Sequence, residues 1–189
     1  NILDEHVTKF IVVESKFTHS GEKRNLLFDI NKYSKFKNKI NYVILENEPS
    51  NLEIINDSDT ADKKNSKYIM NALKRENFQR NGIKKGLTNA KPDDLILVSD
   101  VDEIPNLSNL NISAINDNII LFKQNFYYYK FNLKLEDMLW SGTKGCKYKN
   151  LKSPQWLRNI KDKKYPFWRL DVLFSDKKYS NIISIENGG

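Results

Sequence analysis

The chain has 189 residues, of which 39% are hydrophobic and 29% are charged, and its net charge is +7. This length suits one domain with a core of its own, and the apolar content excludes a disordered chain. No stretch approaches the roughly 18 apolar residues that are needed to cross a bilayer. We therefore expect a single domain over residues 1–189, without a transmembrane segment.

The positive charge and the lone cysteine limit the partners and the compartment only weakly. A basic surface can bind nucleic acid, or it can attract another polyanion such as a nucleotide diphosphate. The lysines are scattered along the chain instead of forming one block, so we expect a solvated face and no specific nucleic-acid partner. Cys146 excludes an intrachain disulfide, which favours a reducing compartment, the cytoplasm.

Two short apolar runs open the chain, at residues 10–14 and 41–45, and both predict buried strands. Residues 26–36 between them predict a short helix. The stretch 46–65 is rich in Asn, Asp and Ser, which predicts a long loop.

The principal helix is predicted over residues 66–87, with one apolar face formed by Ile69, Leu73, Ile83 and Leu87. Residues 94–99 form an apolar run that predicts a central, parallel strand. Residues 119–131 are rich in aromatic β-formers and predict one or two strands. Ser153 before Pro154 predicts the start of a helix that continues to residue 160. Strands that alternate with helices imply an α/β sheet.

The segment after the strand at 94–99 carries three carboxylates, Asp100, Asp102 and Glu103. An apolar strand delivers such residues to the carboxyl edge of the sheet, where open α/β sheets bind ligands. Two carboxylates about 5 Å apart repel by roughly 3 kcal/mol at an effective dielectric of about 20, and a divalent cation relieves that repulsion. The alternative is a solvated acidic turn or a helix cap. The position at the end of a buried strand favours a metal site.

Two charged residues, Glu76 and Arg80, interrupt the apolar face of the predicted helix. Burying an unpaired charge is costly, so this pair must form an ion pair or contact a ligand. One interpretation is a bridge that only positions the helix. The other has Arg80 reaching the carboxyl edge of the sheet, where it contacts phosphate or orients the carboxylates of the metal site, with Arg75 and Gln79 beside it. The two interpretations are compatible.

Four segments occur in a fixed order, and together they resemble glycosyltransferase family 17, which includes the β-1,4-N-acetylglucosaminyltransferases III. They are Ser15-Lys-Phe-Thr-His-Ser-Gly21, Arg75-Glu-Asn-Phe-Gln-Arg-Asn-Gly82, Val98-Ser-Asp-Val-Asp-Glu-Ile-Pro105 and Leu139-Trp-Ser-Gly-Thr143. The resemblance spans nearly the whole chain.

The resemblance implies a GT-A fold, that is, a Rossmann-like, mostly parallel sheet flanked by helices. It also implies a UDP-sugar donor, which is UDP-GlcNAc in the known enzymes of the family, a cofactor of Mn²⁺ or Mg²⁺, and inversion at the anomeric carbon. Carried over by position, Asp102 binds the metal directly, and Asp100 contacts the ribose or reaches the metal through water. Glu14 stands where GT-A enzymes often contact uracil. His19, Arg75, Gln79 and Arg80 match motif positions and are expected near the donor.

The resemblance also leads us to expect an incomplete domain. Family members usually begin with another strand and helix before residues 10–14, and they continue past the final Gly-Gly with a Trp-His segment.

The catalytic base for the acceptor hydroxyl stays unassigned among Glu103, Glu136 and Asp137. Trp140, with Gly142 and Thr143, either forms a wall for the acceptor sugar or belongs to the core.

Two other functions compete with transfer to a glycan acceptor. The first is a metal-dependent nuclease or nucleotidyltransferase that uses the same carboxylates, and it predicts a steep salt dependence of nucleic-acid binding. The second is a non-catalytic carbohydrate-binding relative.

Overall fold

The computed structural model describes residues 2–108, 110–116, 118–130, 132–161 and 181–189. The chain divides into two compact units. We call Val7–Thr88 the long-helix unit, and Asn1–His6 together with Asn89–Gly189 the four-stranded unit.

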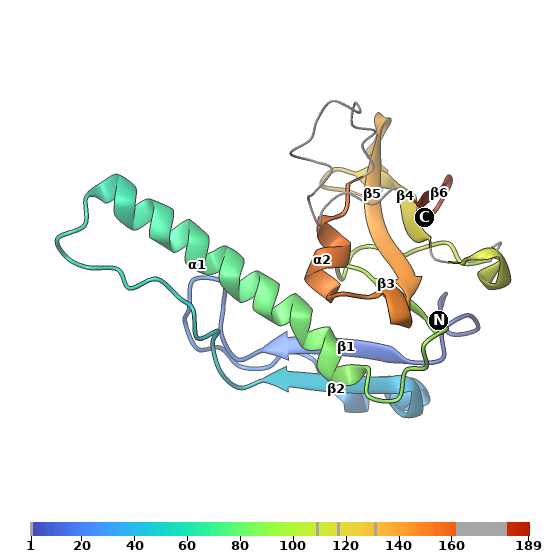
Figure 1. The fold of residues 1–189 in the computed structure, drawn as a ribbon, viewed down its shortest axis with the longest axis horizontal. Coiled ribbons are helices and arrows are strands. Elements are labelled where there is room, and N and C mark those ends of the chain that lie inside the picture. The colour runs from blue at the N-terminus through green and yellow to red at the C-terminus, as the bar shows by residue number, and fades with distance from the viewer. Residues whose placement is uncertain (1, 109, 117, 131, 162–180) are drawn as a thin grey trace. The chain divides into compact units, whose positions relative to one another are not determined.

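The long-helix unit contains a pair of parallel strands, β1 (Phe10–Ser15) and β2 (Ile40–Leu45), which Figure 1 shows side by side. All six residues of each strand are paired, from Phe10 with Ile40 to Ser15 with Leu45. The 3-10 helix η1 (Ile30–Lys39) leads into β2. Both predicted strands are therefore confirmed, and a helical segment does lie between them. Their predicted burial is confirmed only at their carboxyl ends, at Glu14, Ser15 and Leu45, because the other strand residues are half-buried.

The long helix α1 (Ala61–Asn81) begins five residues earlier than predicted. The hydroxyl of Thr60 accepts a hydrogen bond from the backbone N–H of Lys63 and so caps the helix within the stretch predicted as loop. The 3-10 helix η2 (Gly82–Gly86) continues directly from α1.

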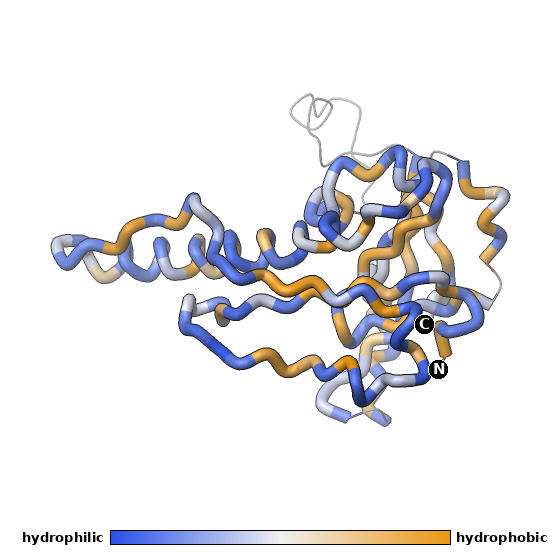
Figure 2. The backbone as a smooth tube through the Cα atoms, turned by 90° about the horizontal axis from the view of Figure 1, so that it is seen from below, coloured by the Kyte–Doolittle hydropathy of each residue, from blue (hydrophilic) through white to orange (hydrophobic). Residues whose placement is uncertain are grey.

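The predicted apolar face of this helix is wrong in its first half. Ile69 and Leu73 are 63% and 45% exposed, whereas Leu87, after η2, is buried. The buried residue of α1 is Asn71, whose side-chain amide exchanges two hydrogen bonds with the backbone of Glu53. A polar contact to the preceding loop thus replaces the expected apolar one, and hydrophobic and hydrophilic residues are mixed along the helix in Figure 2.

The four-stranded unit contains β3 (Leu95–Val98), β4 (Ile119–Tyr127), β5 (Lys134–Lys147) and β6 (Ile182–Ile185), in the spatial order β3-β5-β4-β6. Strand β5 pairs antiparallel with both β3 and β4, and β6 pairs parallel with β4. The short 3-10 helices η3 (Ile112–Ala114) and η4 (Tyr148–Asn150) lie before β4 and after β5.

The α/β class is confirmed, but the mostly parallel, Rossmann-like sheet is not. In the described residues β3 is an outer strand with an antiparallel partner, so its predicted central and parallel position is wrong. Strand β5 lies between β3 and β4 and takes the place that a parallel neighbour of β3 would have. It follows β4 after a short connection, bridged by the bond from Tyr128 N–H to the Leu133 carbonyl, and such a local reversal makes the β4–β5 pairing antiparallel.

The core of the four-stranded unit centres on β4. Ile119, Ile120, Leu121 and Phe122 have no exposed surface, and each such side chain contributes about 1.5–3 kcal/mol of burial free energy. The helix α2 (Pro154–Asn159) adds Leu157, which is also fully buried. The predicted start of this helix is confirmed, because the Ser153 hydroxyl accepts from the N–H of Trp156 and Pro154 occupies the first turn.

No helix among the described residues is both long enough and apolar enough to span a bilayer.

Candidate functional site

The three carboxylates predicted as a metal site lie in a tight turn directly after β3. The backbone N–H of Glu103 donates to the carbonyl of Asp100 over 3.1 Å and closes residues 100–103, which we call the acidic turn. Asp102 is exposed, and the Asp100 side chain is 43% exposed. Glu103, in contrast, is buried. The turn thus presents Asp100 and Asp102 to solvent and directs Glu103 inward.

The inward carboxylate of Glu103 holds the turn together. It accepts from the backbone N–H of Asp100 (3.0 Å) and from the indole N–H of Trp140 (2.8 Å). Arg158 adds two further bonds, from Nη1 over 2.8 Å and from Nη2 over 2.9 Å. Four donors fill the acceptor capacity of a carboxylate. The geometry therefore favours a holding role for Glu103 over the role of catalytic base.

Arg158 is a residue that sequence reasoning missed. Besides Glu103, its guanidinium donates to Oδ2 of Asp100 over 2.8 Å and to the carbonyl of Gly142 over 2.6 Å. Its side chain is only 9% exposed. One arginine thus joins the acidic turn, strand β5 and helix α2.

A signal for Arg158 was present in the composition. Only five of the 31 basic residues are arginine, and a planar guanidinium is not replaceable by lysine where it must bind two partners at once. Each of the four arginines in the described residues forms an ion pair with a carboxylate: Arg24 with Glu14, Arg75 with Glu48, Arg80 with Glu76, and Arg158 with Asp100 and Glu103. In a chain dominated by lysine, an arginine marks a specific contact.

The Leu139–Thr143 segment, expected as a sugar wall, packs against the acidic turn. Trp140 donates its indole N–H to Glu103, yet the residue is 41% exposed. Its ring lies 6.1 Å from that of Phe126, at a tilted angle. Trp140 is therefore neither a buried core residue nor a free surface residue, because its indole N–H is fixed while part of the side chain reaches solvent.

Gly142 and Thr143 are fully packed under this site. A Cβ at position 142 would lie 1.7 Å from Oε1 of Gln124, so only glycine fits there. The same Oε1 accepts from the backbone N–H of Thr143, and the Thr143 hydroxyl bonds that of Ser99 over 2.7 Å. These two residues support the site and are too buried to contact a sugar.

The remaining predicted donor residues lie in the long-helix unit. Glu14 is buried at the end of β1 and accepts four hydrogen bonds, from Tyr42 (2.6 Å), Arg24 (2.8 Å) and the backbone N–H groups of Leu27 (2.7 Å) and Phe28 (3.1 Å). Burial alone would raise the pKa of Glu14, but the hydroxyl of Tyr42, the two N–H groups and the Arg24 charge outweigh it and hold the pKa below 4.5. In this structure the carboxylate fastens the segment after β1, and its contact with uracil stays a prediction.

Two of the family-like segments meet in the turn formed by residues 18–22. The guanidinium of Arg75 donates to the backbone carbonyl of His19 over 3.1 Å and pairs with Glu48. Gly21 has a φ of +96°, and a Cβ there would lie 2.4 Å from Nη2 of Arg75. We call residues 18–22, held in this way, the glycine turn. The exposed His19 side chain is not what Arg75 binds.

Gln79 and Arg80, on α1, form contacts within the long-helix unit. The Gln79 amide donates to the carbonyl of Val13 in β1 over 3.3 Å. Arg80 pairs with Glu76 over 2.9 Å, which confirms the predicted ion pair on the helix. Whether Arg80 also contacts a phosphate stays a prediction.

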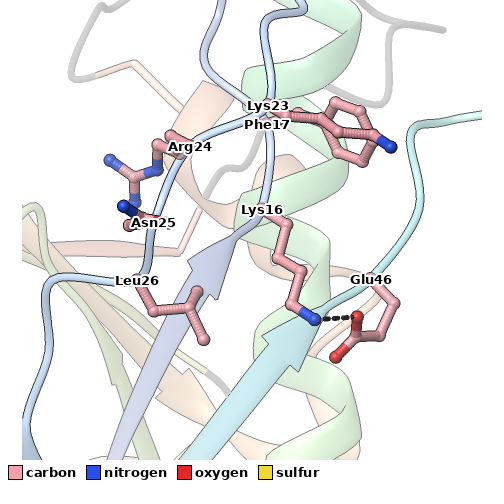
Figure 3. A pocket seen from close by; sticks show the side chains of 7 residues that line it. All are labelled: Lys16, Phe17, Lys23, Arg24, Asn25, Leu26 and Glu46. Carbon is pink, nitrogen blue, oxygen red and sulfur yellow. Dashed lines mark ion pairs between the residues drawn. The ribbon is translucent and has the colours of Figure 1, made fainter.

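A cavity of about 840 Å³ opens at the carboxyl ends of β1 and β2 (Figure 3). Figure 3 shows the ammonium group of Lys16 paired with Glu46 across it, and Lys23 and Arg24 on the opposite strand of the turn. Glu46 pairs with Lys16, and Glu14 pairs with Arg24, so these three cationic and two anionic side chains leave a formal charge of +1. A positive charge of this kind attracts anions. The residues that line it are Lys16, Phe17, Lys23, Arg24, Asn25, Leu26 and Glu46.

The model of glycosyltransferase family 17 matches residues 1–156. The chain belongs to this family. No curated protein and no solved structure matches the chain. All four family-like segments fall inside the matched range, whereas Arg158 lies two residues beyond it.

Family membership makes the charge of the acidic turn informative. Asp100, Asp102 and Glu103 with Arg158 leave a formal charge of −2, which one divalent cation would balance. Among the described residues, no group of three or more His, Cys, Asp or Glu side chains is placed to hold a metal ion. Mg²⁺ and similar cations commonly take one or two carboxylates and complete the shell with substrate phosphates and water. Asp100 and Asp102 therefore fit a cation that arrives with a diphosphate.

The other base candidates lie on β5. Glu136 is exposed and pairs with Lys134 over 3.1 Å. The side chain of Asp137 lies outside the part of the chain that the structure describes.

Proposed function

We propose that this family 17 protein is a GT-A-type enzyme that transfers a sugar, GlcNAc, from a UDP-sugar to a hydroxyl of a glycan acceptor, with inversion. The observation that carries the proposal is the acidic turn. Asp100 and Asp102 follow a strand directly and reach solvent. Hydrogen bonds among Glu103, Trp140 and Arg158 hold the turn that carries them.

In this proposal Asp102 holds Mn²⁺ or Mg²⁺ directly, and Asp100 contacts the donor ribose or the cation through water. When bound, the cation supplies positive charge against the diphosphate that accumulates charge as it departs. The protein's part is to fix the Asp100 carboxylate through Arg158, and to place Asp102 in a closed turn, before the donor arrives. A fixed site of this kind loses little free energy to reorganisation during the reaction.

The acceptor side uses Trp140 and a carboxylate on β5. A partly exposed indole with its N–H already bonded suits stacking against the apolar face of a sugar ring. Attack by the acceptor hydroxyl needs a base. With the Glu103 carboxylate filled by four donors, Glu136 and Asp137 are the remaining candidates.

The test measures UDP released from UDP-GlcNAc in the presence of Mn²⁺, with and without EDTA, for the wild type and Asp102→Asn. We expect release by the wild type that EDTA and the substitution both abolish. Lys149→Met serves as the matched control, because Lys149 pairs with Asp93 on the surface of the same unit, away from the turn. A panel of other UDP-sugars identifies the donor.

The same assay separates the two rival functions. Sugar binding that survives both EDTA and Asp102→Asn, without UDP release, would indicate a non-catalytic carbohydrate-binding protein. Metal-dependent cleavage of nucleic acid, with binding that weakens steeply with salt, would indicate a nuclease.

A further inference from the structure

We propose that Arg158 is a positioning residue that sets the cation affinity of the acidic turn by fixing the Asp100 carboxylate. This inference rests on the proposed function, since it concerns the same turn. It assigns a role to a residue outside the range that the family model matches.

The guanidinium of Arg158 joins three partners that are distant in sequence. Nη2 donates to Asp100 and to Glu103, and Nη1 donates to Glu103 and to the carbonyl of Gly142. All four distances lie between 2.6 and 2.9 Å. Because Gly142 and Glu103 are buried, the guanidinium has little freedom to move, and it holds Asp100 in one orientation.

The backbone of Arg158 is anchored as firmly as its side chain. The buried ammonium of Lys144, on β5, donates to the carbonyls of Arg158 and Ile160 at the end of α2. A cation is favourable at the carboxyl end of a helix, where carbonyls lack helical partners. Leu157 and Ile160 on either side are fully buried. Both the backbone and the guanidinium of Arg158 are thus held in place, as is required of a residue that orients metal ligands.

Arg158 also decides which carboxylates remain for a cation. Its charge is opposed mainly to buried Glu103, whose side chain is 5% exposed, whereas Asp100 is 43% exposed. The guanidinium therefore neutralises the inward carboxylate of Glu103, whereas at Asp100 it occupies Oδ2 and fixes the direction of a carboxylate that still reaches solvent. A lysine would supply the charge but not the planar fork that spans Asp100, Glu103 and Gly142.

Two effects of removing Arg158 oppose each other, and this makes the inference testable. Loss of the positive charge would strengthen cation binding by simple electrostatics. Loss of the fixed carboxylate would weaken it, and substitutions of residues that orient metal ligands typically cost tenfold or more in affinity. We expect orientation to dominate.

The experiment measures Mn²⁺ binding by electron paramagnetic resonance of the free ion, in the presence of UDP, for the wild type, Arg158→Met, Arg158→Lys and the control Lys149→Met. All measurements are made below the unfolding temperature of each variant. We expect about tenfold or greater weakening for Arg158→Met, a smaller weakening for Arg158→Lys, and no change for the control. Arg158→Lys keeps the buried charge and so provides a folded variant if Arg158→Met does not fold.

Unchanged Mn²⁺ affinity in folded Arg158→Lys and Arg158→Met, with only a lower unfolding temperature, would reduce Arg158 to a structural residue and overturn the inference. Tighter Mn²⁺ binding would also overturn it, since it would make Arg158 a competitor of the cation. If the wild type itself binds no Mn²⁺, the proposed function fails first and the inference fails with it.

Discussion

The molecule contains two turns that are each held by an arginine from a helix, and they differ in what the arginine holds. In the acidic turn, Arg158 of α2 binds two carboxylates, one of them buried. In the glycine turn, Arg75 of α1 binds a backbone carbonyl and Glu48, whose side chain is 30% exposed. Both turns follow a strand, and both depend on a glycine that leaves no room for a side chain.

This difference teaches how the two turns are used. Arg75 fixes the path of the backbone through the His19 carbonyl, and its ion pair with Glu48 is partly exposed. Arg158 fixes the orientation of two carboxylates, of which Glu103 is buried and Asp100 belongs to the proposed cation site. We therefore expect Arg75 to support the fold alone, and Arg158 to support both the fold and the proposed site.

The largest expected effect separates the two arginines directly. Arg158→Met leaves Glu103 buried without its ion-pair partner and should lower the free energy of unfolding by about 3–5 kcal/mol. Arg75→Met removes hydrogen bonds whose acceptors reach solvent more easily, and should cost about 1 kcal/mol. Urea unfolding followed by circular dichroism measures both. Equal losses would contradict the distinction between the turns.

The next effect tests the packing beneath the acidic turn. Gly142→Ala places a Cβ into Gln124 and should cost about 2–3 kcal/mol, because a buried, bonded side chain must move. Gly145→Ala is the control, since the atom nearest to its Cβ would be a terminal methyl group of Leu97, at 2.6 Å, and the backbone oxygen of Ile96 would be 3.4 Å away. We expect a cost of about 1 kcal/mol. Urea unfolding measures both. A smaller loss of unfolding free energy for Gly142→Ala than for Gly145→Ala would show that the Gln124 side chain moves aside at little cost.

In the long-helix unit, Tyr42→Phe removes the hydroxyl that donates to Glu14 and should cost about 2 kcal/mol, as for other hydrogen bonds to a charged group. Burial and the bond to Glu14 raise the pKa of Tyr42 from 10.0 to about 12. A raised pKa in the folded state means that this stability is complete below pH 10 and is lost as the pH rises towards 12. Unfolding free energies between pH 8 and 12 should therefore fall in the wild type and change less in the variant.

Glu14, the partner of Tyr42, makes stability depend on pH in the opposite direction, at acid pH. Because the pKa of Glu14 lies below 4.5, its stability is present above that pH and is lost as the pH falls further. Tyr33→Phe, in the same unit but half exposed, should leave both limbs of the pH profile unchanged. If the unfolding free energy of Tyr42→Phe depended on pH in the same way as that of the wild type, the hydrogen bond between Tyr42 and Glu14 would contribute nothing to stability.

The smallest effects concern the glycine turn itself. Gly21→Ala forces a left-handed φ on alanine and should cost about 1–2 kcal/mol. His19→Ala should change the unfolding free energy by less than about 0.5 kcal/mol, because Arg75 contacts only its carbonyl and the side chain is exposed. Thermal unfolding measures both. A large loss for His19→Ala would reveal a side-chain contact.

The sequence predicts the locally encoded parts of this molecule well. Apolar runs located β1, β2, β3 and β4, and the Ser153-Pro154 pair located the start of α2. The acidic turn was found because its carboxylates follow a buried strand. Strand β5 was not predicted as a strand, because Lys134, Glu136 and Lys144 break any apolar pattern, and its pairing with β3 and β4 holds it in place instead.

The site's support was missed for a related reason. Arg158 lies 58 positions from Asp100 and 55 from Glu103. No spacing rule connects residues so far apart, and only the fold brings them together. The same holds for the filled carboxylate of Glu14, whose partner Tyr42 lies on the neighbouring strand.

The central claim is that Asp100 and Asp102 hold a divalent cation together with the donor diphosphate. Anomalous diffraction from crystals grown with Mn²⁺ and UDP tests it most directly. We predict one strong manganese peak within coordination distance of the Asp102 carboxylate and of the diphosphate. A bound UDP with no manganese beside the acidic turn, or manganese held only elsewhere, would contradict the account.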